Sequence, residues 1–265
     1  MRINSIQNTY YNHTPHNPQF KSWKREVFTH QRIGEVQHRN HTWVYRDYAF
    51  WKKLAEHLTE RYKNIPKVNV YNFGCSNGSE AYTFLMQLMA NYDPQTVKKF
   101  TPIIAKDYDK VAIDYAKSRL LPMDEDEIDS INKYTNNSFN KFFESDKIIL
   151  NEATHFIPKS ILTDNVRFEI GDITKDLNKI KSKNTILIAR NFLPYIPNMK
   201  QTIEAIGKHL KDNCTMIVGN YEYTGASWRG YEFNKLMYNA GFNKINEYIY
   251  EKDPKLIKRL WYDLF

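Results

Sequence analysis

Two glycines that follow directly on a β-like run are the first residues whose type and spacing suggest chemistry. The run covers residues 68–73, and Gly74 and Gly78 separate it from a helical pattern over residues 81–89. Glycine lets the backbone turn sharply and come close to a ligand, and the amides at a helix N-terminus can face a carboxylate. The loop has neither the lysine of a phosphate-binding P-loop nor the spacing of the dinucleotide fingerprint. It predicts either a small-molecule site or a tight structural turn.

Polar residues also follow three further β-like runs. Asp107 stands 33 residues beyond Gly74 (107 − 74 = 33). A carboxylate at such a strand end can accept hydrogen bonds from both hydroxyls of a ribose. Asp172 and Ile173 follow Gly171, and a short polar side chain before an apolar one suits the edge and face of an adenine ring. Residues 190–195, R-N-F-L-P-Y, place two polar side chains and a phenol where a reacting group would lie. An ordinary acidic residue or turn remains the alternative for Asp107 and Asp172.

The order of the predicted elements indicates where these residues meet. Apolar residues at helical spacing alternate along the chain with short β-like runs. This alternation is typical of an α/β, Rossmann-like, doubly wound and mostly parallel sheet, in which ligands bind beyond the carboxyl ends of the strands. The expected strands cover residues 68–73, 102–105, 166–170, 185–189 and 214–218, and the expected helices cover residues 46–62, 81–89, 111–116, 199–210 and 228–239. Residues 242–250 and 256–265 are expected to pair as a terminal hairpin with an antiparallel edge strand.

Residues 118–165 interrupt this alternation. They contain an acidic run at residues 124–129, a predicted helix over residues 127–143, and β-like runs at residues 147–150 and 155–157. We therefore expect a small inserted subdomain at this place in the chain.

The composition limits the class of protein. Of the 265 residues, 42% are hydrophobic, which is enough for one large domain with a small appendage. No apolar run approaches the roughly 20 residues of a membrane span, and residues 1–20 lack the apolar core of a secretory signal. We expect a cytoplasmic protein without membrane insertion. Cys75 and Cys214 have no metal-ligand spacing, so they predict buried reduced thiols and no metal site.

The charge of the chain suggests the kind of partner. The formal net charge of +8 results from 38 lysines and arginines against 30 aspartates and glutamates. Basic residues interleaved with aromatic ones gather between residues 21 and 46. Because no nucleic-acid-binding module is recognisable, we expect an acidic protein partner rather than a nucleic acid.

Four segments, taken in order, resemble one known family. Residues 75–82, C-S-N-G-S-E-A-Y, are similar to the C-S-x-G-x-E-x-Y segment of the CheR-type chemotaxis-receptor glutamate methyltransferases, and residues 105–109, A-K-D-Y-D, are similar to their A-x-D-x-D. Residues 190–195 resemble R-N-V-x-I-Y. Residues 40–47, N-H-T-W-V-Y-R-D, resemble N-x-T-x-F-F-R-D, which is the most specific of the four. Residues 219–222, G-N-Y-E, resemble the family's G-H-S-E more weakly.

The chain departs from the family pattern at a few positions. Asp172 stands where the family usually has Asn, Ser79 replaces a frequent Glu, and Pro194 changes the backbone before Tyr195. About 40 residues precede the Asn40 motif, fewer than the helical receptor-docking domain of this family would need.

The resemblance implies a class I methyltransferase that uses S-adenosyl-L-methionine and releases S-adenosyl-L-homocysteine. It implies that Arg46 and Tyr195 flank the transferred methyl group, as candidate catalytic residues. The implied cofactor-binding residues are Asn40, Thr42, Arg46, Gly74, Ser76, Gly78, Glu80, Asp107, Asp172, Ile173, Arg190 and Asn191.

The resemblance also implies a division of the chain and an acceptor. Residues 1–63 would be a basic leader and a helix that contributes to the cofactor site, and residues 64–265 would be the methyltransferase domain with its insertion at about residues 118–165. The implied acceptor is the carboxylate of a protein glutamate, in an acidic partner such as a chemoreceptor. Two alternatives stay open: methyl transfer to another protein group or a small molecule, and a non-catalytic regulatory module that binds S-adenosylmethionine.

Overall fold

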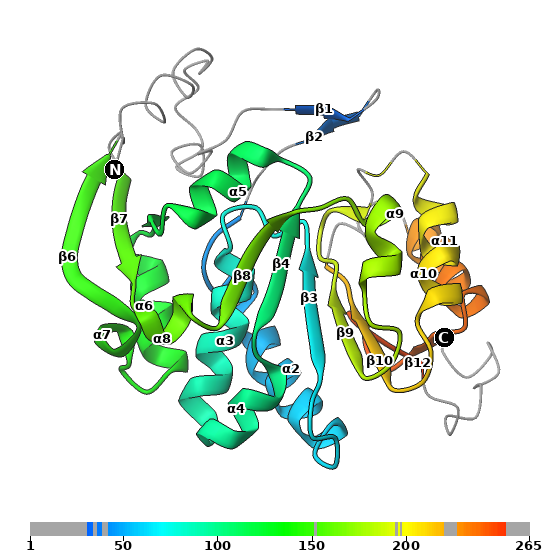
Figure 1. Cartoon of the computed structure of the whole chain (residues 1–265), viewed down its shortest axis with the longest axis horizontal. Helices are drawn as coiled ribbons and strands as arrows, with labels where there is room; N and C mark the ends of the chain where they lie inside the picture. Colours follow the sequence, from blue (N-terminus) through cyan, green and yellow to red (C-terminus); the bar gives the residue numbers. More distant parts are fainter. Residues whose placement is uncertain are drawn as a thin grey trace.

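The β-like runs of the sequence form one seven-stranded sheet at the centre of the computed structural model (Figure 1). Its strand order is β11-β12-β10-β9-β3-β4-β8, and the strands from β10 to β8 are parallel. β12 runs antiparallel to β10, which confirms the predicted antiparallel strand near one edge. The strands are β3 (Asn69–Phe73), β4 (Ile103–Asp107), β8 (Val166–Ile170), β9 (Thr185–Ile188), β10 (Cys214–Ile217), β11 (Asn243–Lys244) and β12 (Ile249–Lys252). The structure describes residues 31–33, 36–38, 42–150, 153–193, 196, 198–219 and 227–252.

Side chains that alternate along the parallel strands divide the core into two layers. Val70 and Ile186 belong to one apolar cluster, whereas the next residues, Tyr71 and Leu187, belong to another. Because successive side chains of a strand point to opposite faces, each cluster lies on its own face of the sheet. The helices packed on the first face include α2 (Tyr48–Arg61), α3 (Ser79–Asn91) and α4 (Pro94–Phe100), and those on the second include α10 (Met199–His209) and α11 (Ser227–Asn239). Helices on both faces make the sheet doubly wound, as predicted.

Helix α4 is an element that the sequence analysis did not predict. It begins with Pro94 at its first position, and the Asp93 side chain accepts hydrogen bonds from the amides of Gln95 and Thr96 at 2.9 and 3.0 Å. An Asp cap followed by Pro is a helix-start signal, but a seven-residue helix is too short for its apolar periodicity to stand out.

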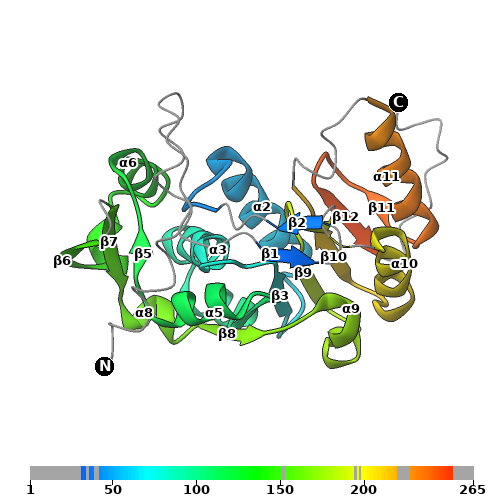
Figure 2. The ribbon, with the colours of Figure 1, turned by 90° about the horizontal axis from the view of Figure 1, so that it is seen from above.

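The interruption at residues 118–165 forms a separate three-stranded antiparallel sheet of order β5-β7-β6, beyond the β8 edge of the main sheet (Figures 1 and 2). The predicted single helix over residues 127–143 is wrong, because two helices occupy this region. Asn136 and Asn137 separate them with φ values of 53° and 57°, in the left-handed region that asparagine tolerates. The elements are β5 (Leu121–Pro122), α6 (Glu125–Tyr134), α7 (Phe139–Phe142), β6 (Phe143–Leu150), β7 (Ala153–Pro158) and α8 (Ser160–Thr163).

The predicted strand over residues 242–250 is also divided in two. Asn246 Oδ1 accepts from the amides of Tyr248 and Ile249 at 3.0 and 3.1 Å, and this local turn reverses the chain between β11 and β12. The hairpin therefore forms within the predicted strand, and the expected pairing with residues 256–265 lies outside the described residues.

The described parts of the N-terminal region lie near the carboxyl ends of the parallel strands. β1 (Gln31–Ile33) and β2 (Val36–His38) pair as a short antiparallel hairpin on the side toward which these strands point (Figures 1 and 2). In the described part of the chain, no helix has the length and apolar character needed to cross a membrane, and no group of three or more His, Cys, Asp or Glu side chains could hold a metal ion.

Candidate functional site

The glycine loop joins β3 to α3 at the carboxyl end of the central strand. Gly74 and Gly78 have φ values of +69° and +87°, and Gly78 is the N-cap of α3. A Cβ at Gly74 would lie 2.8 Å from Phe192 Cγ, and one at Gly78 would lie 2.5 Å from Phe168 Cζ. Backbone conformation and packing thus both require glycine here, so the turn itself already explains these two residues.

Asp107 ends β4 and ties that strand to the glycine loop. Its Oδ2 accepts from the Ser76 amide at 2.8 Å, and its Oδ1 accepts from the Asp109 amide at 2.9 Å. Burial raises the pKa of Asp107 to about 6, although the hydrogen bonds from these two amides oppose the rise. Each carboxylate oxygen has a second lone pair, so the side chain can still accept hydrogen bonds from a ligand.

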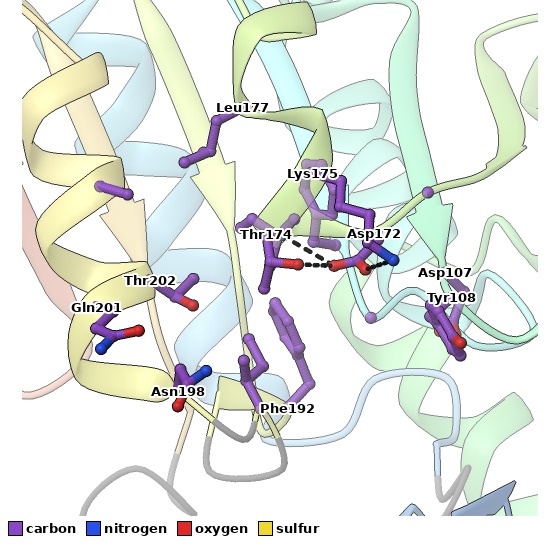
Figure 3. Close-up of a pocket in the computed structure, with 16 residues that line it drawn as sticks. Asp107, Tyr108, Asp172, Thr174, Lys175, Leu177, Phe192, Asn198, Gln201 and Thr202 are labelled. Carbon is purple, nitrogen blue, oxygen red and sulfur yellow. Dashed lines mark hydrogen bonds and ion pairs between the residues drawn. The ribbon is translucent and has the colours of Figure 1, made fainter. Parts of the chain in front are cut away.

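A pocket of about 470 Å³ opens at the carboxyl ends of the strands, and Figure 3 shows its lining. It brings together four predicted residues from three strand ends: Gly74 after β3, Asp107 at the end of β4, and Asp172 and Ile173 after β8. The lining residues are Phe73, Gly74, Asp107, Tyr108, Gly171, Asp172, Ile173, Thr174, Lys175, Leu177, Phe192, Ile196, Asn198, Gln201, Thr202 and Ala205.

Asp172 caps the short helix α9 (Ile173–Asp176) beside this pocket. Its Oδ1 accepts from the amide and the hydroxyl of Thr174 at 2.9 and 2.7 Å, and its Oδ2 lies 3.2 Å from Lys175 Nζ (Figure 3). Ile173 is 3% exposed and packs in the second core layer. The cap therefore fixes the orientation of the Asp172 carboxylate and of the adjacent apolar Ile173 in this wall of the pocket.

Two further predicted residues, Arg190 and Glu80, form a buried ion pair, and Arg190 also pairs with the more exposed Asp47. Arg190 Nη1 lies 2.9 Å from Glu80 Oε1, and Arg190 Nη2 lies 2.5 Å from Asp47 Oδ2. The guanidinium also lies over the rings of Phe50 and Trp51, with its Cζ 4.9 Å from each centroid. Arg190 and Glu80 are 5% and 6% exposed, so this pair is shielded from water.

The electrostatics of Glu80 reflect this position. Burial raises the pKa of Glu80, while the positive charges of Arg190 and Arg46 oppose the rise. Arg46 therefore lies close enough to Glu80 to influence it, and its own guanidinium stands 4.7 Å from the Trp43 ring centroid. Thr42 is half-buried in the same segment.

Asn191 follows Arg190 in left-handed backbone, with φ 59°. Its amide packs so closely on Gly219 that a Cβ there would lie 2.2 Å from Asn191 Oδ1. Asn40 and Tyr195, the remaining predicted site residues, lie outside the described residues.

The residues present fit S-adenosylmethionine. The pocket volume lies within the range of about 300–1,000 Å³ found for small-molecule sites, and its wall combines the Asp107 carboxylate with apolar Ile173 and Phe192. Ser76 Oγ and Glu80 Oε2 are buried and have no hydrogen-bond partner among the described residues. Buried polar atoms are normally paired, so both atoms can take a partner from a ligand, although neither residue is among those that line the pocket.

Several residues around the site were missed by the sequence analysis. Asn198, the N-cap of α10, and Gln201 and Thr202 of that helix reach the pocket together with Ala205. Their spacing of i, i+3, i+4 and i+7 places them on one helix face. Three polar residues on that face could have predicted that it lines a binding site. Asp47 was quoted only as a letter of the upstream motif, and nothing in the sequence pairs it with Arg190.

The fold and the pocket define the class: an α/β, Rossmann-like, doubly wound fold with a ligand site at the carboxyl ends of its parallel strands. Residues 40–235 match the family model described as CheR methyltransferase, SAM binding domain. This match covers most of the sequence, so the chain belongs to the CheR methyltransferase family, and its cofactor is S-adenosylmethionine.

Similar proteins differ from this chain in sequence and length. A chemotaxis protein methyltransferase of Borreliella burgdorferi is 24% identical over 191 residues, which are 69% of this chain and 64% of that protein. This chain thus matches less than two thirds of that relative's length. Among solved structures, the DszA carbon methyltransferase has a TM-score of 0.44 and 11% identity, covering 76% of this chain and 50% of that one. The precorrin-6y C5,15-methyltransferase of Geobacter metallireducens has a TM-score of 0.39 and 7% identity, covering 72% of both chains.

Proposed function

We propose that this protein transfers the methyl group of S-adenosylmethionine to the carboxylate of a protein glutamate, in an acidic partner such as a chemoreceptor. One observation carries the proposal: Arg190 at the end of β9 pairs with Asp47 of the upstream motif and with Glu80 of the glycine-loop helix, and its pair with Glu80 is buried. These ion pairs link the upstream segment, the most specific of the CheR-like motifs, to residues of the proposed donor site. The name of the Borreliella relative supports the acceptor class.

The donor would be held by residues of both groups. Asp107 would accept hydrogen bonds from the ribose hydroxyls. Asp172 would contact the edge of the adenine ring, and Ile173 would pack against its face. Glu80 and Ser76 each have a buried oxygen atom that suits the amino-acid end. Asn40, Thr42, Arg46, Arg190 and Asn191 would complete the site, with Arg190 acting through its bonds to Glu80 and Asp47.

The proposed transfer requires positioning rather than a strong base. S-adenosylmethionine supplies an electrophilic methyl group on a sulfonium. A glutamate acceptor has an unperturbed pKa of about 4.3, so it is already ionised and nucleophilic at neutral pH. Arg46 would anchor a carboxylate of donor or acceptor, and Tyr195 would orient the acceptor oxygen. An enclosed site that aligns the two reactants supplies most of the rate effect.

The test incubates the purified full chain with methyl-labelled S-adenosylmethionine and an acidic chemoreceptor fragment. We expect labelled protein that releases methanol in mild base, because carboxyl methyl esters hydrolyse under these conditions. Label that survives mild base would contradict the ester and favour another protein group. Binding of S-adenosylmethionine by calorimetry, without S-adenosylhomocysteine formation on any acceptor, would favour a regulatory module instead.

A further inference from the structure

The turn before α2 presents Arg46 between two residues in left-handed backbone. The φ values are 55° at Tyr45 and 59° at Asp47. Neither residue is glycine, so this conformation costs free energy and persists only because neighbouring contacts hold it. Two of these contacts come from the main fold. Trp51 Nε1 of α2 donates to the Arg46 carbonyl oxygen at 2.7 Å, and Thr83 Oγ1 of α3 accepts from the Tyr45 amide at 3.0 Å.

A third contact comes from the inserted subdomain, through Glu127 in the first turn of α6. Its Oε1 accepts from the Val44 amide at 2.8 Å, and its Oε2 accepts from the Asp124 amide at 2.9 Å. Glu127 and Val44 are only 4% and 1% exposed, so water cannot readily replace the first bond. One carboxylate thus joins the backbone of the Arg46 turn to the start of α6.

The same face of α6 continues this contact toward the end of the helix. Ile131 and Tyr134 lie four and seven residues after Glu127, which places all three on one face. The Tyr134 ring stacks on that of Tyr45, with centroids 6.0 Å apart and an interplanar angle of 19°, and Ile131 is fully buried. The helix therefore holds the turn by a hydrogen bond at one end and a ring contact at the other.

We propose that Glu127 is a positioning residue for the donor site, which couples the inserted subdomain to the turn that presents Arg46. The inference rests on the proposed function, in which Arg46 contacts the donor. Without the Glu127 carboxylate, the Val44 amide loses its buried acceptor and the turn is released to ordinary backbone conformations. The apparent donor affinity is then the intrinsic affinity multiplied by the fraction of molecules in which the turn is still correctly formed.

A matched pair of variants separates positioning from helix capping. Glu127→Ala and Asp124→Ala each remove one half of the capping box of α6, since Asp124 Oδ1 accepts from the Glu127 amide at 3.0 Å. Only Glu127→Ala removes the bond to Val44. With calorimetry of S-adenosylhomocysteine binding to folded full-length protein, we expect Kd to rise about tenfold in Glu127→Ala, as for a turn formed in about one molecule in ten. Asp124→Ala should change Kd less than about twofold.

A conservative variant provides a second readout. Glu127→Gln keeps an oxygen acceptor, and we expect it to bind S-adenosylhomocysteine more tightly than Glu127→Ala does. If circular dichroism shows that Glu127→Ala does not fold, Glu127→Gln is compared with Asp124→Asn. A neutral amide oxygen is a weaker acceptor for the Val44 amide than a carboxylate, so we expect the weaker binding in Glu127→Gln. Equal Kd values within either pair overturn the positioning role while the wild type still binds. A wild type that binds neither S-adenosylmethionine nor S-adenosylhomocysteine overturns the proposed function itself, and the inference with it.

Discussion

Replacement of Arg190 by methionine removes a buried cation that holds two ion pairs. Arg190 lies 2.9 Å from Glu80 and 2.5 Å from Asp47, and it packs over the rings of Phe50 and Trp51. Methionine keeps an apolar stem against these rings but cannot pair with a carboxylate. The Glu80 side chain is 8% exposed, whereas that of Asp47 is 37% exposed and retains contact with water. Removal of the cation therefore destabilises the protein mainly through Glu80, whose buried carboxylate is left without its ion-pair partner.

The sign of the effect follows from the pKa of Glu80. Burial already raises this pKa, and Arg190 is the largest opposing influence, so its removal raises the pKa of Glu80 further. A carboxyl group whose pKa is raised in the folded state destabilises the fold above its unfolded pKa, and the cost grows as pH rises. The variant should therefore be closest to the wild type in acid and should lose stability toward neutral pH.

The size of the effect has an upper limit, reached when Glu80 folds only in its protonated form. With an unfolded pKa of about 4.3, this costs about 1.36 × (7.0 − 4.3) ≈ 3.7 kcal/mol at pH 7 and about 1 kcal/mol at pH 5. The exposed Asp47 adds less than about 1 kcal/mol. At roughly 2–4 °C per kcal/mol, this limit corresponds to a Tm at most about 7–15 °C below the wild type at pH 7 and at most about 2–4 °C below it at pH 5.

Thermal unfolding followed by circular dichroism at pH 5, 6 and 7 measures this difference. The matched control is Arg190→Met combined with Glu80→Gln, which removes the titrating group. Its Tm deficit should be nearly constant over this pH range. A deficit of equal size at pH 5 and pH 7 in the single variant, or an equally steep one in the double variant, would show that Glu80 is not the group that depends on Arg190.

Three further predictions concern the pocket and the reaction. Because burial raises the pKa of Asp107 to about 6, the carboxylate is about tenfold less populated at pH 5 than at pH 7. Calorimetry should therefore show Kd for S-adenosylhomocysteine rising about tenfold as pH falls over this range, and an Asp107→Asn variant that retains the dependence would contradict the assignment. Gly78→Ala should lower the unfolding free energy in denaturant titrations by at least about 1–2 kcal/mol, from left-handed strain and contact with Phe168, whereas an unchanged midpoint would argue against a left-handed turn at this position. Tyr195→Phe should slow methyl transfer in initial-rate assays while leaving donor binding nearly intact, and an unchanged rate removes Tyr195 from the mechanism.

The parallel sheet could be predicted because its strands are short, buried on both faces and bounded by turn residues. Residues 185–189 and 214–218 carry such runs, and the structure has β9 and β10 there. Ligands bind beyond the carboxyl ends of parallel strands. On this basis Asp107 and Asp172, 65 residues apart (172 − 107 = 65), were predicted to line one pocket, and they do. Strand order thus carries information on the site even where each residue by itself is ambiguous.

Errors arose where local side-chain bonds override periodicity. Apolar residues continue at helical spacing past Tyr134, but Asn136 and Asn137 adopt left-handed backbone and end α6. Similarly, the Asn246 side chain closes the turn between β11 and β12 within a β-like run. Asparagine occurs within helices and strands as well as in turns. Whether its side-chain hydrogen bonds end an element can therefore be read only once the surrounding fold is known.

Ion-pair partners were beyond the reach of the sequence because they depend on contacts between distant segments. Asp47 closes the upstream motif and Arg190 opens the motif after β9, and these two residues are 143 positions apart in the chain. A single guanidinium nevertheless joins them and also binds Glu80 of the glycine-loop segment. Three motifs that look independent in the sequence are therefore joined by the ion pairs of one buried guanidinium. In the proposed donor site, a residue in such a motif would be required for donor binding without touching the donor, because its loss would release the strained turn that presents Arg46.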